Sequence, residues 1–152
     1  MYDPSRGFPS VVPYLRYQDP ELGIRWFSCV LGAIEVLRLT LDDGQVGHVE
    51  FTLGSSVLTL GLSLKPPLRA GPEENRFTLR QMTLVFVDDV DAVVERVGEY
   101  GGSVVEPPTD QPWGLRQAIV EDPEGYYWEL SRHLKDVAPS DWGAELVGPL
   151  PG

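Results

Sequence analysis

The stretch Val11-Val12-Pro13-Tyr14-Leu15-Arg16-Tyr17-Gln18-Asp19 (residues 11–19) has a counterpart in Thr83-Leu84-Val85-Phe86-Val87-Asp88-Asp89 (residues 83–89). Each is an extended, β-prone run that ends at an aspartate, and Asp89 lies 70 positions after Asp19. Such an aspartate accepts hydrogen bonds from the free backbone N–H groups that open a helix, and Pro20 suits the first helical position, where no N–H is needed. The two stretches therefore predict a strand followed by a helix, twice in one chain.

The expected helices continue the repeat. Apolar residues recur every three or four positions in both segments, as is typical of an amphipathic helix: Leu22, Trp26, Phe27, Val30 and Leu31, then Val90, Val93, Val94, Val97 and Tyr100. The helices are expected to end at Gly32 and at Gly101-Gly102, with Gly102 70 positions after Gly32, so the repeat is predicted to keep this offset across the helix. Cys29 is interpreted as a small buried hydrophobic residue.

Three further strands are predicted after each helix, so that each half reads βαβββ. Their ranges are Ala33–Leu41, Gly47–Leu53 and Val57–Ser63, then Ser103–Glu106, Leu115–Val120 and Tyr126–Ser131. The fold class is α+β, with two tandem modules that form curved mixed sheets around a concave cavity and carry helices on the outer face. We expect one domain over residues 1–152, with module 1 at about 9–64, a Pro- and Gly-rich linker at 65–80, module 2 at about 81–134 and a surface tail at 135–152.

Composition narrows the choice of partners. The chain has 152 residues, is 42% hydrophobic and carries a formal charge of −11, from 12 Lys+Arg against 23 Asp+Glu. That charge repels phosphate backbones, so nucleic acid is a poor partner and a cationic ligand is a plausible one, although the acidity could simply keep the protein soluble. The absence of a long apolar run argues against a membrane, and a lone cysteine with no recognisable secretion signal is typical of a cytoplasmic protein.

A tandem βαβββ pair resembles the vicinal oxygen chelate superfamily, which includes glyoxalase I, extradiol dioxygenases and bleomycin-resistance proteins. Residues 11–20 resemble the opening of the glyoxalase and bleomycin-resistance branch. The segment Gln111-Pro112-Trp113-Gly114-Leu115-Arg116 and the segment from Val120 to Leu130, with its Asp122-Pro123-Glu124-Gly125 turn, resemble its close. The resemblance covers about residues 9–134 and is specific for the superfamily, but it does not identify the activity.

The resemblance also locates a possible metal site. Metal-dependent members hold the ion with residues from the first and last strand of each module, and these positions correspond here to Val12, Thr59, Met82 and Glu129. Only Glu129 is a strong donor, whereas a catalytic zinc usually has three protein ligands. We therefore expect no metal and no other cofactor.

Strand alternation predicts which side chains face the cavity, because residues two apart share a face of a sheet. In Gly47–Leu53 the apolar residues Val49, Phe51 and Leu53 would pack under a helix, and Trp128 and Leu130 would do so in the last strand. Trp113 is placed at the cavity rim by the resemblance. The candidate ligand-binding residues are Tyr14, Arg16, His48, Glu50, Phe86, Trp113, Tyr127 and Glu129.

Several of these residues have alternative interpretations. His48 and Glu50 could join Glu129 in an unconventional metal site or act as an acid/base pair, or could be solvated groups on an open sheet. Glu129 is the one candidate catalytic residue, but it could instead pair with Arg16 or Arg116 as part of the scaffold. Trp113 could stack on a ligand or close the core.

Three functional hypotheses follow. The first is a metal-independent binding protein of the bleomycin-resistance type that sequesters a small cationic or aromatic compound, such as an antibiotic. The alternative is a glyoxalase-like lyase or isomerase, or a dioxygenase-like enzyme, that uses a metal or acid/base chemistry at Glu129, His48 and Glu50. The third is a regulatory module without a ligand. We also expect a homodimer, because half-open sheets of this superfamily close against another module and open sheet edges are prone to pair.

Overall fold

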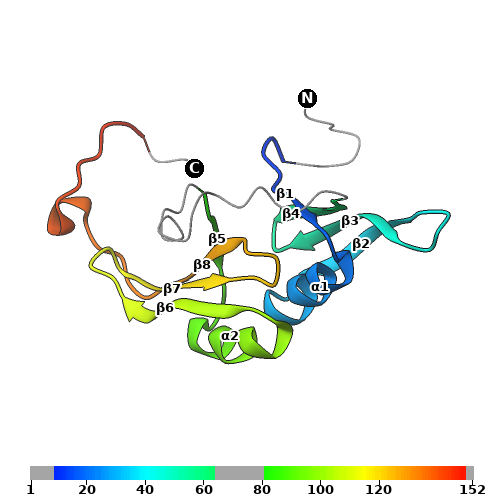
Figure 1. Cartoon of the computed structure of the whole chain (residues 1–152). Helices are drawn as coiled ribbons and strands as arrows, with labels where there is room; N and C mark the ends of the chain where they lie inside the picture. The colour runs from blue at the N-terminus through cyan, green and yellow to red at the C-terminus, as the bar shows by residue number, and fades with distance from the viewer. Residues whose placement is uncertain (1–8, 64–80, 150–152) are drawn as a thin grey trace, which may run out of the picture.

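The computed structural model describes residues 9–63 and 81–149, and the linker expected at 65–80 lies outside these ranges (Figure 1). Module 1 consists of β1 (Tyr14–Tyr17), α1 (Pro20–Arg25), a π-helical turn (Trp26–Val30), β2 (Ile34–Thr40), β3 (Val46–Leu53) and β4 (Ser56–Leu62). Module 2 consists of β5 (Thr83–Phe86), α2 (Val90–Val97), a 3-10 turn (Gly98–Tyr100), β6 (Ser103–Asp110), β7 (Leu115–Glu121) and β8 (Tyr127–His133). A further 3-10 turn, Pro139–Trp142, follows in the tail.

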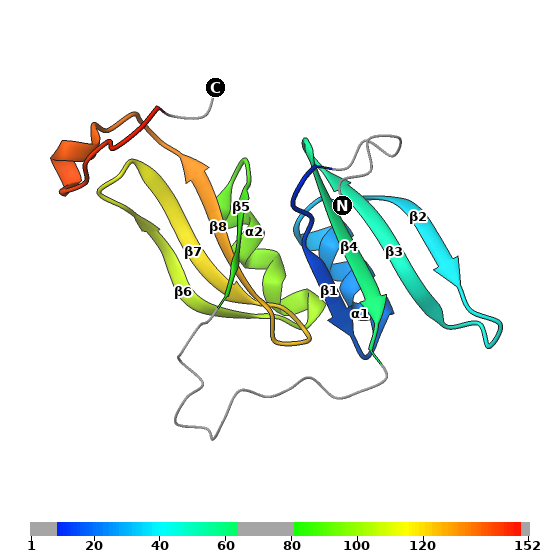
Figure 2. The same ribbon diagram turned by 90° about the horizontal axis from the view of Figure 1, so that it is seen from above.

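Each module forms a four-stranded mixed sheet. The strand orders are β1-β4-β3-β2 and β5-β8-β7-β6, with the first and last strand of each module parallel and the other pairs antiparallel. Helix α1 packs on β3 and β4, and α2 packs on β6, β7 and β8. Figure 2 shows each helix behind its own sheet, so that the opposite face of each sheet is open. The α+β fold with two tandem βαβββ modules is confirmed.

The predicted repeat is exact where the first and last strands meet. Tyr14 is the partner of Thr59 in module 1, and Leu84 is the partner of Glu129 in module 2, so both members of the pair shift by 70 positions. Asp19 and Asp89 cap their helices as predicted, by accepting hydrogen bonds from the backbone N–H groups of Glu21 and Ala92. The same local sequence therefore sets the same strand register and helix start twice.

The offset does not hold across the whole helix. The left-handed glycines after the helices are Gly32 (φ 75°) and Gly101 (φ 83°), so Gly101 rather than Gly102 corresponds to Gly32. Module 1 has one extra residue here, and a π-helical turn, which closes longer hydrogen-bonded rings than an α-helix, accommodates it. The repeat returns to 70 in the last strand of each module, because Glu50 pairs with Thr59 nine positions later, whereas Ile119 pairs with Glu129 ten positions later.

Apolar residues from both modules form one core. Val49 and Phe51 of β3 and Trp128 and Leu130 of β8 are fully buried, which confirms the predicted inward faces of these strands. The ring of Phe27 in module 1 lies 5.6 Å from that of Trp128 in module 2, in an edge-to-face contact. The helical layer thus joins the two sheets.

Two expectations about smaller features are wrong. Cys29 is exposed rather than buried, because the π-helical turn rotates it away from the face that carries Trp26 and Phe27. Strand β6 extends to Asp110, whereas the predicted strand ends at Glu106. No helix in the described ranges is both long and apolar enough to cross a membrane.

Candidate functional site

The open face of the module 2 sheet carries two rows of side chains, set by the strand register. Residues directly opposite each other on neighbouring strands point to the same face of a sheet. One row runs across the four strands through Leu84, Glu129, Ile119 and Glu106. The next row runs through Phe86, Ser131, Gln117 and Thr109.

A cavity of about 250 Å³ opens on these rows, at the end formed by β6 and β7. It is lined by residues of β6, β7, β8 and the β6–β7 loop: Glu106, Pro107, Thr109, Gln111, Trp113, Gln117, Ala118, Ile119 and Glu129. The lining thus combines the apolar side chains of a tryptophan, an isoleucine, a proline and an alanine with two carboxylates. A mixed apolar and acidic lining is suited to an aromatic or cationic small molecule.

Gln117 organises the polar side of the cavity. Its amide oxygen accepts a hydrogen bond from Trp113 Nε1 at 2.9 Å, and its amide nitrogen donates to Glu129 Oε1 and to Ser131 Oγ, the latter at 2.9 Å. Gln117 and Ser131 are buried, whereas Trp113 is 40% exposed. The tryptophan and the carboxylate are therefore fixed relative to each other by one buried amide before any ligand arrives.

Glu129 has an electrostatic environment that favours a cation. Its partial burial in the cavity, together with the negative charge of Glu106, raises the pKa of Glu129 above its ordinary value. Both effects disfavour an isolated carboxylate, and a positively charged group between the two glutamates would relieve both. An ionised carboxylate accepts about four hydrogen bonds, so the bond from Gln117 leaves acceptor capacity for a ligand.

The open face of module 1 has a different arrangement at the equivalent positions. Tyr14 crosses over Gly61, whose missing side chain makes room for the tyrosine hydroxyl end, and its ring meets that of His48 edge-on at 5.8 Å. His48 Nε2 lies 3.2 Å from Glu50 Oε1, and the Arg16 guanidinium donates to the Leu62 carbonyl oxygen at 2.6 Å. The open face of module 1 thus combines aromatic, basic and acidic side chains.

Comparison with known proteins decides the family. A model of the Glyoxalase/Bleomycin resistance protein/Dioxygenase superfamily matches residues 8–130. The chain belongs to this superfamily. The crystal structure of TioX from Micromonospora sp. ML1 is 31% identical, with a TM-score of 0.63, and the match covers 83% of this chain and 99% of TioX.

Two further proteins are similar to this chain at lower sequence identity. An uncharacterized protein of Mycobacterium bovis is 27% identical over 132 residues, which cover 85% of this chain and 86% of that protein. The fosfomycin resistance protein FosX from Mesorhizobium loti is 21% identical, with a TM-score of 0.57, and the match covers 82% of this chain and 90% of FosX. At this identity, FosX shows the shared fold alone.

The metal site of the superfamily's metal-dependent members does not fit the donors present here. The hydroxyl of Thr59 donates to the Pro13 carbonyl oxygen at 2.8 Å, and Glu129 is engaged by Gln117. Val12 and Met82 offer no oxygen or nitrogen in their side chains. Within residues 9–63 and 81–149, no group of three or more His, Cys, Asp or Glu side chains is arranged to hold a metal ion.

The structure divides the candidate residues between two surfaces. Trp113 and Glu129 meet in the module 2 cavity, and Tyr14, Arg16, His48 and Glu50 cluster on the module 1 sheet. Phe86 is exposed on the edge strand β5, in the same row as Gln117. Tyr127 is the first residue of β8 and does not line the cavity. Within the chain, Glu129 is therefore not grouped with His48 and Glu50.

Of the residues that line the cavity, only Trp113 and Glu129 were among the candidates. The most informative of those missed are Gln117 and Glu106 in the lining and Trp142, which contacts Trp113 from the tail. Strand alternation could have identified Gln117, which lies two positions before Ile119 on a strand that flanks β8. The suggested pairing of Glu129 with an arginine is wrong, because Arg16 bonds to a backbone carbonyl and Arg116 bonds to Asp91 and Asp110.

Proposed function

We propose that the protein is a metal-independent small-molecule binding protein of the bleomycin-resistance type, which sequesters a cationic aromatic compound, such as an antibiotic, in the module 2 cavity. The observation that carries this proposal is the hydrogen-bonded series Trp113–Gln117–Glu129 in the cavity wall. It presents a flat aromatic surface and a carboxylate in a fixed geometry. Preorganised contacts of this kind raise affinity because little side-chain freedom remains to be lost on binding.

The chemistry of the ligand follows from the wall. A tryptophan face attracts a cation or a flat ring, with an energy of about 0.5–2 kcal/mol that depends on desolvation. Glu129 and Glu106 add negative charge at one end of the cavity, where partial burial strengthens electrostatic attraction. A ring that carries a positive charge satisfies both features at once.

We also propose that the protein works as a homodimer in which the open face of one protomer covers that of its partner. Large apolar residues are exposed on these faces, with Ile34 67%, Tyr14 54% and Phe86 61% exposed. The module 1 face carries Arg16 and a His48–Glu50 pair, and the module 2 face carries Glu106 and Glu129, so an arginine on one face can lie opposite the glutamates of the other. Large apolar side chains exposed on an open sheet face are typical of an interface.

One observation favours the alternative that the protein is an enzyme. A carboxyl with a raised pKa is suited to general acid/base catalysis, and burial raises the pKa of Glu129. Such an enzyme would be a glyoxalase-like or dioxygenase-like protein, with Glu129 as the proton-transferring group. The fixed Trp113 and the acidic pair need no reaction to explain them, so binding is the simpler function.

A thermal-shift screen across antibiotics and aromatic metabolites tests the proposal. We expect cationic aromatic compounds to raise the melting temperature of the wild type, and Trp113→Ala to reduce that shift. Turnover of a stabilising compound would favour the enzyme, and stoichiometric zinc, nickel, manganese or iron in protein purified without added metal would refute metal independence. Sedimentation at micromolar concentration should give a dimer, and a stable monomer would contradict the proposed assembly.

A further inference from the structure

The tail after β8 folds back onto the loop that carries Trp113 (Figure 1, orange to red). The backbone N–H groups of Leu134 and Lys135 both donate to the Gly114 carbonyl oxygen, at 2.9 and 3.3 Å. His133 Nε2 lies 2.9 Å from Asp136 Oδ1, which holds the first turn of the tail. The tail is thus anchored beside the cavity rather than loose at the surface.

Gly114 allows the backbone of the tail to pass directly over the loop that carries Trp113. Its φ is +88°, in the left-handed region, and a Cβ at this position would collide with the Lys135 carbonyl oxygen. The Cβ would also meet Val137 Cγ2 at 3.0 Å. A backbone that passes so close to the tryptophan loop fixes where the rest of the tail can lie.

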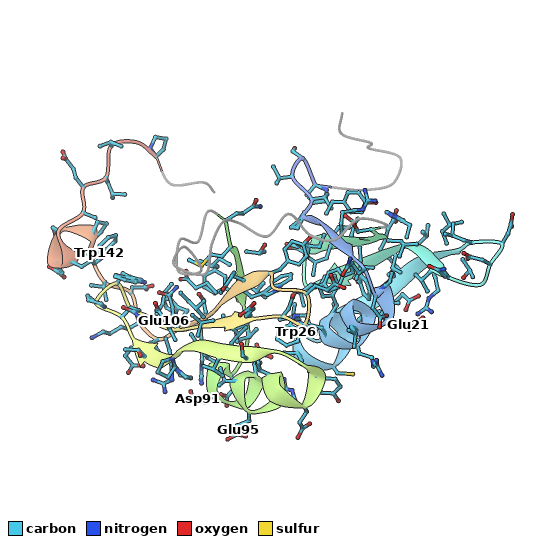
Figure 3. All side chains as sticks on the ribbon, in the orientation of Figure 1. Glu21, Trp26, Asp91, Glu95, Glu106 and Trp142 are labelled. Atoms are coloured by element: carbon cyan, nitrogen blue, oxygen red, sulfur yellow. The ribbon has the colours of Figure 1, made fainter. Side chains whose placement is uncertain are left out.

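The anchored tail brings a second tryptophan to the first. The 3-10 turn Pro139–Trp142 ends at Gly143, which has a φ of +85°, and it places the Trp142 ring 6.0 Å from the Trp113 ring at an interplanar angle of 62°. The two side chains are 41% and 40% exposed. In Figure 3, Trp142 lies at the same end of the molecule as Glu106, away from Glu21 on α1.

We propose that Trp142 is a positioning residue of the ligand site, which holds the Trp113 indole in the orientation that faces the cavity. The bond from Trp113 Nε1 to Gln117 fixes one edge of an indole on an exposed loop, and rotation about that edge remains possible. An edge-to-face contact on another side fixes the plane of the ring. The tail is therefore part of the site that selects a flat cation, an inference that rests on the function proposed above.

The module repeat supports a dedicated role for the tail. Trp142 lies beyond β8, outside the two βαβββ units, and all the contacts described for it and its anchor are made to module 2. Its target, Trp113, lines the module 2 cavity. The added segment thus serves the module that has the cavity.

The binding test uses N-methylquinolinium, a flat permanent cation, titrated by calorimetry into the full chain. Trp142→Ala should weaken binding about three- to tenfold, the range expected for one edge-to-face contact, and Trp142→Phe should restore affinity to within about twofold of the wild type. Val147→Ala, a change at a 93% exposed tail position, is the matched control and should leave affinity unchanged. The double variant Trp113→Ala/Trp142→Ala should bind no more weakly than Trp113→Ala alone. An equal loss from Trp142→Ala in both backgrounds would overturn the positioning role.

A second measurement needs no ligand. The rate at which the Trp113 indole N–H exchanges with water reports how often its bond to Gln117 opens, and NMR of indole-labelled protein measures it. Trp142→Ala should accelerate this exchange at least about threefold, and Val147→Ala should not. Unchanged exchange in Trp142→Ala would overturn the inference whether or not the probe binds. Faster exchange without binding of the probe to the wild type would support the positioning role and count against the proposed ligand class.

Discussion

Tyr17 donates its hydroxyl hydrogen to Asp122, which lies 105 positions further along the chain, and both side chains are buried. Trp128 Nε1 donates to the same carboxylate oxygen at 3.1 Å, and the backbone N–H groups of Glu124 and Tyr126 donate to the other at 3.0 Å. Burial, and then the charge of Asp122, raises the pKa of Tyr17, so the tyrosine keeps its proton. This cluster joins β1 of module 1 to the β7–β8 turn of module 2.

Loss of the tyrosine hydroxyl should loosen that junction. Tyr17→Phe leaves the buried carboxylate with one donor fewer, and we expect a decrease of about 1–3 kcal/mol in the free energy of unfolding. Urea denaturation at neutral pH measures it. Tyr14→Phe, on the same strand but 54% exposed, is the control and should change stability by less than about 0.5 kcal/mol. Equal effects of the two changes would show that the hydroxyl of Tyr17 contributes nothing to the junction.

Asp122→Asn tests the carboxylate itself. An asparagine side chain has one acceptor oxygen and two N–H donors, so it would face donors with a donor of its own. We expect destabilisation of about 2–4 kcal/mol, since more than one buried group loses its partner. Glu124→Gln is the conservative comparison, because its Oε1 accepts from the backbone N–H groups of Gln18 and Asp19 and the amide oxygen can do the same. A loss below about 1 kcal/mol for Asp122→Asn would contradict this account.

Gly114 and Gly44 form a matched pair for the tail anchor. Both have a left-handed φ, +88° and +83°, but a Cβ at Gly44 meets nothing within 4 Å, whereas one at Gly114 collides with the Lys135 carbonyl oxygen. Alanine should therefore cost about 1–2 kcal/mol at either site for the backbone conformation, with a further loss at Gly114 alone. Limited proteolysis should cut the tail faster in Gly114→Ala than in Gly44→Ala. Equal cleavage would mean that the crossing does not hold the tail.

The repeat made most of the fold predictable, because identical local signals recur in the sequence. Asp19 and Asp89 cap helices, and Val49 and Phe51, two positions apart on one strand, identify its inward face. Both signals come from interactions within a few residues of each other in the sequence. The one-residue change in offset was not predictable in this way. The extra residue enters as a π-helical turn over Trp26–Val30, which packs against α2 of the other module, and no local pattern in these residues reveals it.

The candidate site was predictable to a smaller extent. Trp113 and Glu129 were identified from a family resemblance and strand alternation, and both line the cavity. The separation of Glu129 from His48 and Glu50 depends on how two sheets are placed, which alternation within one strand does not encode. Trp142 was missed because a tail rich in Pro and Gly has no periodic pattern, and its contact with Trp113 is set by the crossing at Gly114.

The raised pKa of Glu129 predicts how binding depends on pH. A cation binds the ionised carboxylate, so affinity for N-methylquinolinium should be complete above the raised pKa and fall as the pH decreases through it. The decrease should begin at a higher pH than for an exposed glutamate, whose pKa is about 4.3. The probe does not titrate, and Glu106 is the other ionisable group in the lining. In Glu129→Gln, calorimetry should find that this decrease is lost, and a profile like that of the wild type would assign the titration to another group.

Shape and charge can be separated at the same cavity with two substitutions and two probes. Trp113→Ala removes a flat surface and should weaken N-methylquinolinium and its neutral analogue of similar shape, 1-methylnaphthalene, at every salt concentration. Glu129→Gln keeps the shape, so it should weaken the cation alone, and less so at high salt, where the wild type has already lost part of the attraction. Each loss should be about 1–3 kcal/mol at a site shielded from water, or roughly ten- to a hundredfold in affinity. If neither substitution alters the affinity of the cation by more than about twofold, the Trp113–Gln117–Glu129 wall is part of the scaffold and the ligand binds elsewhere.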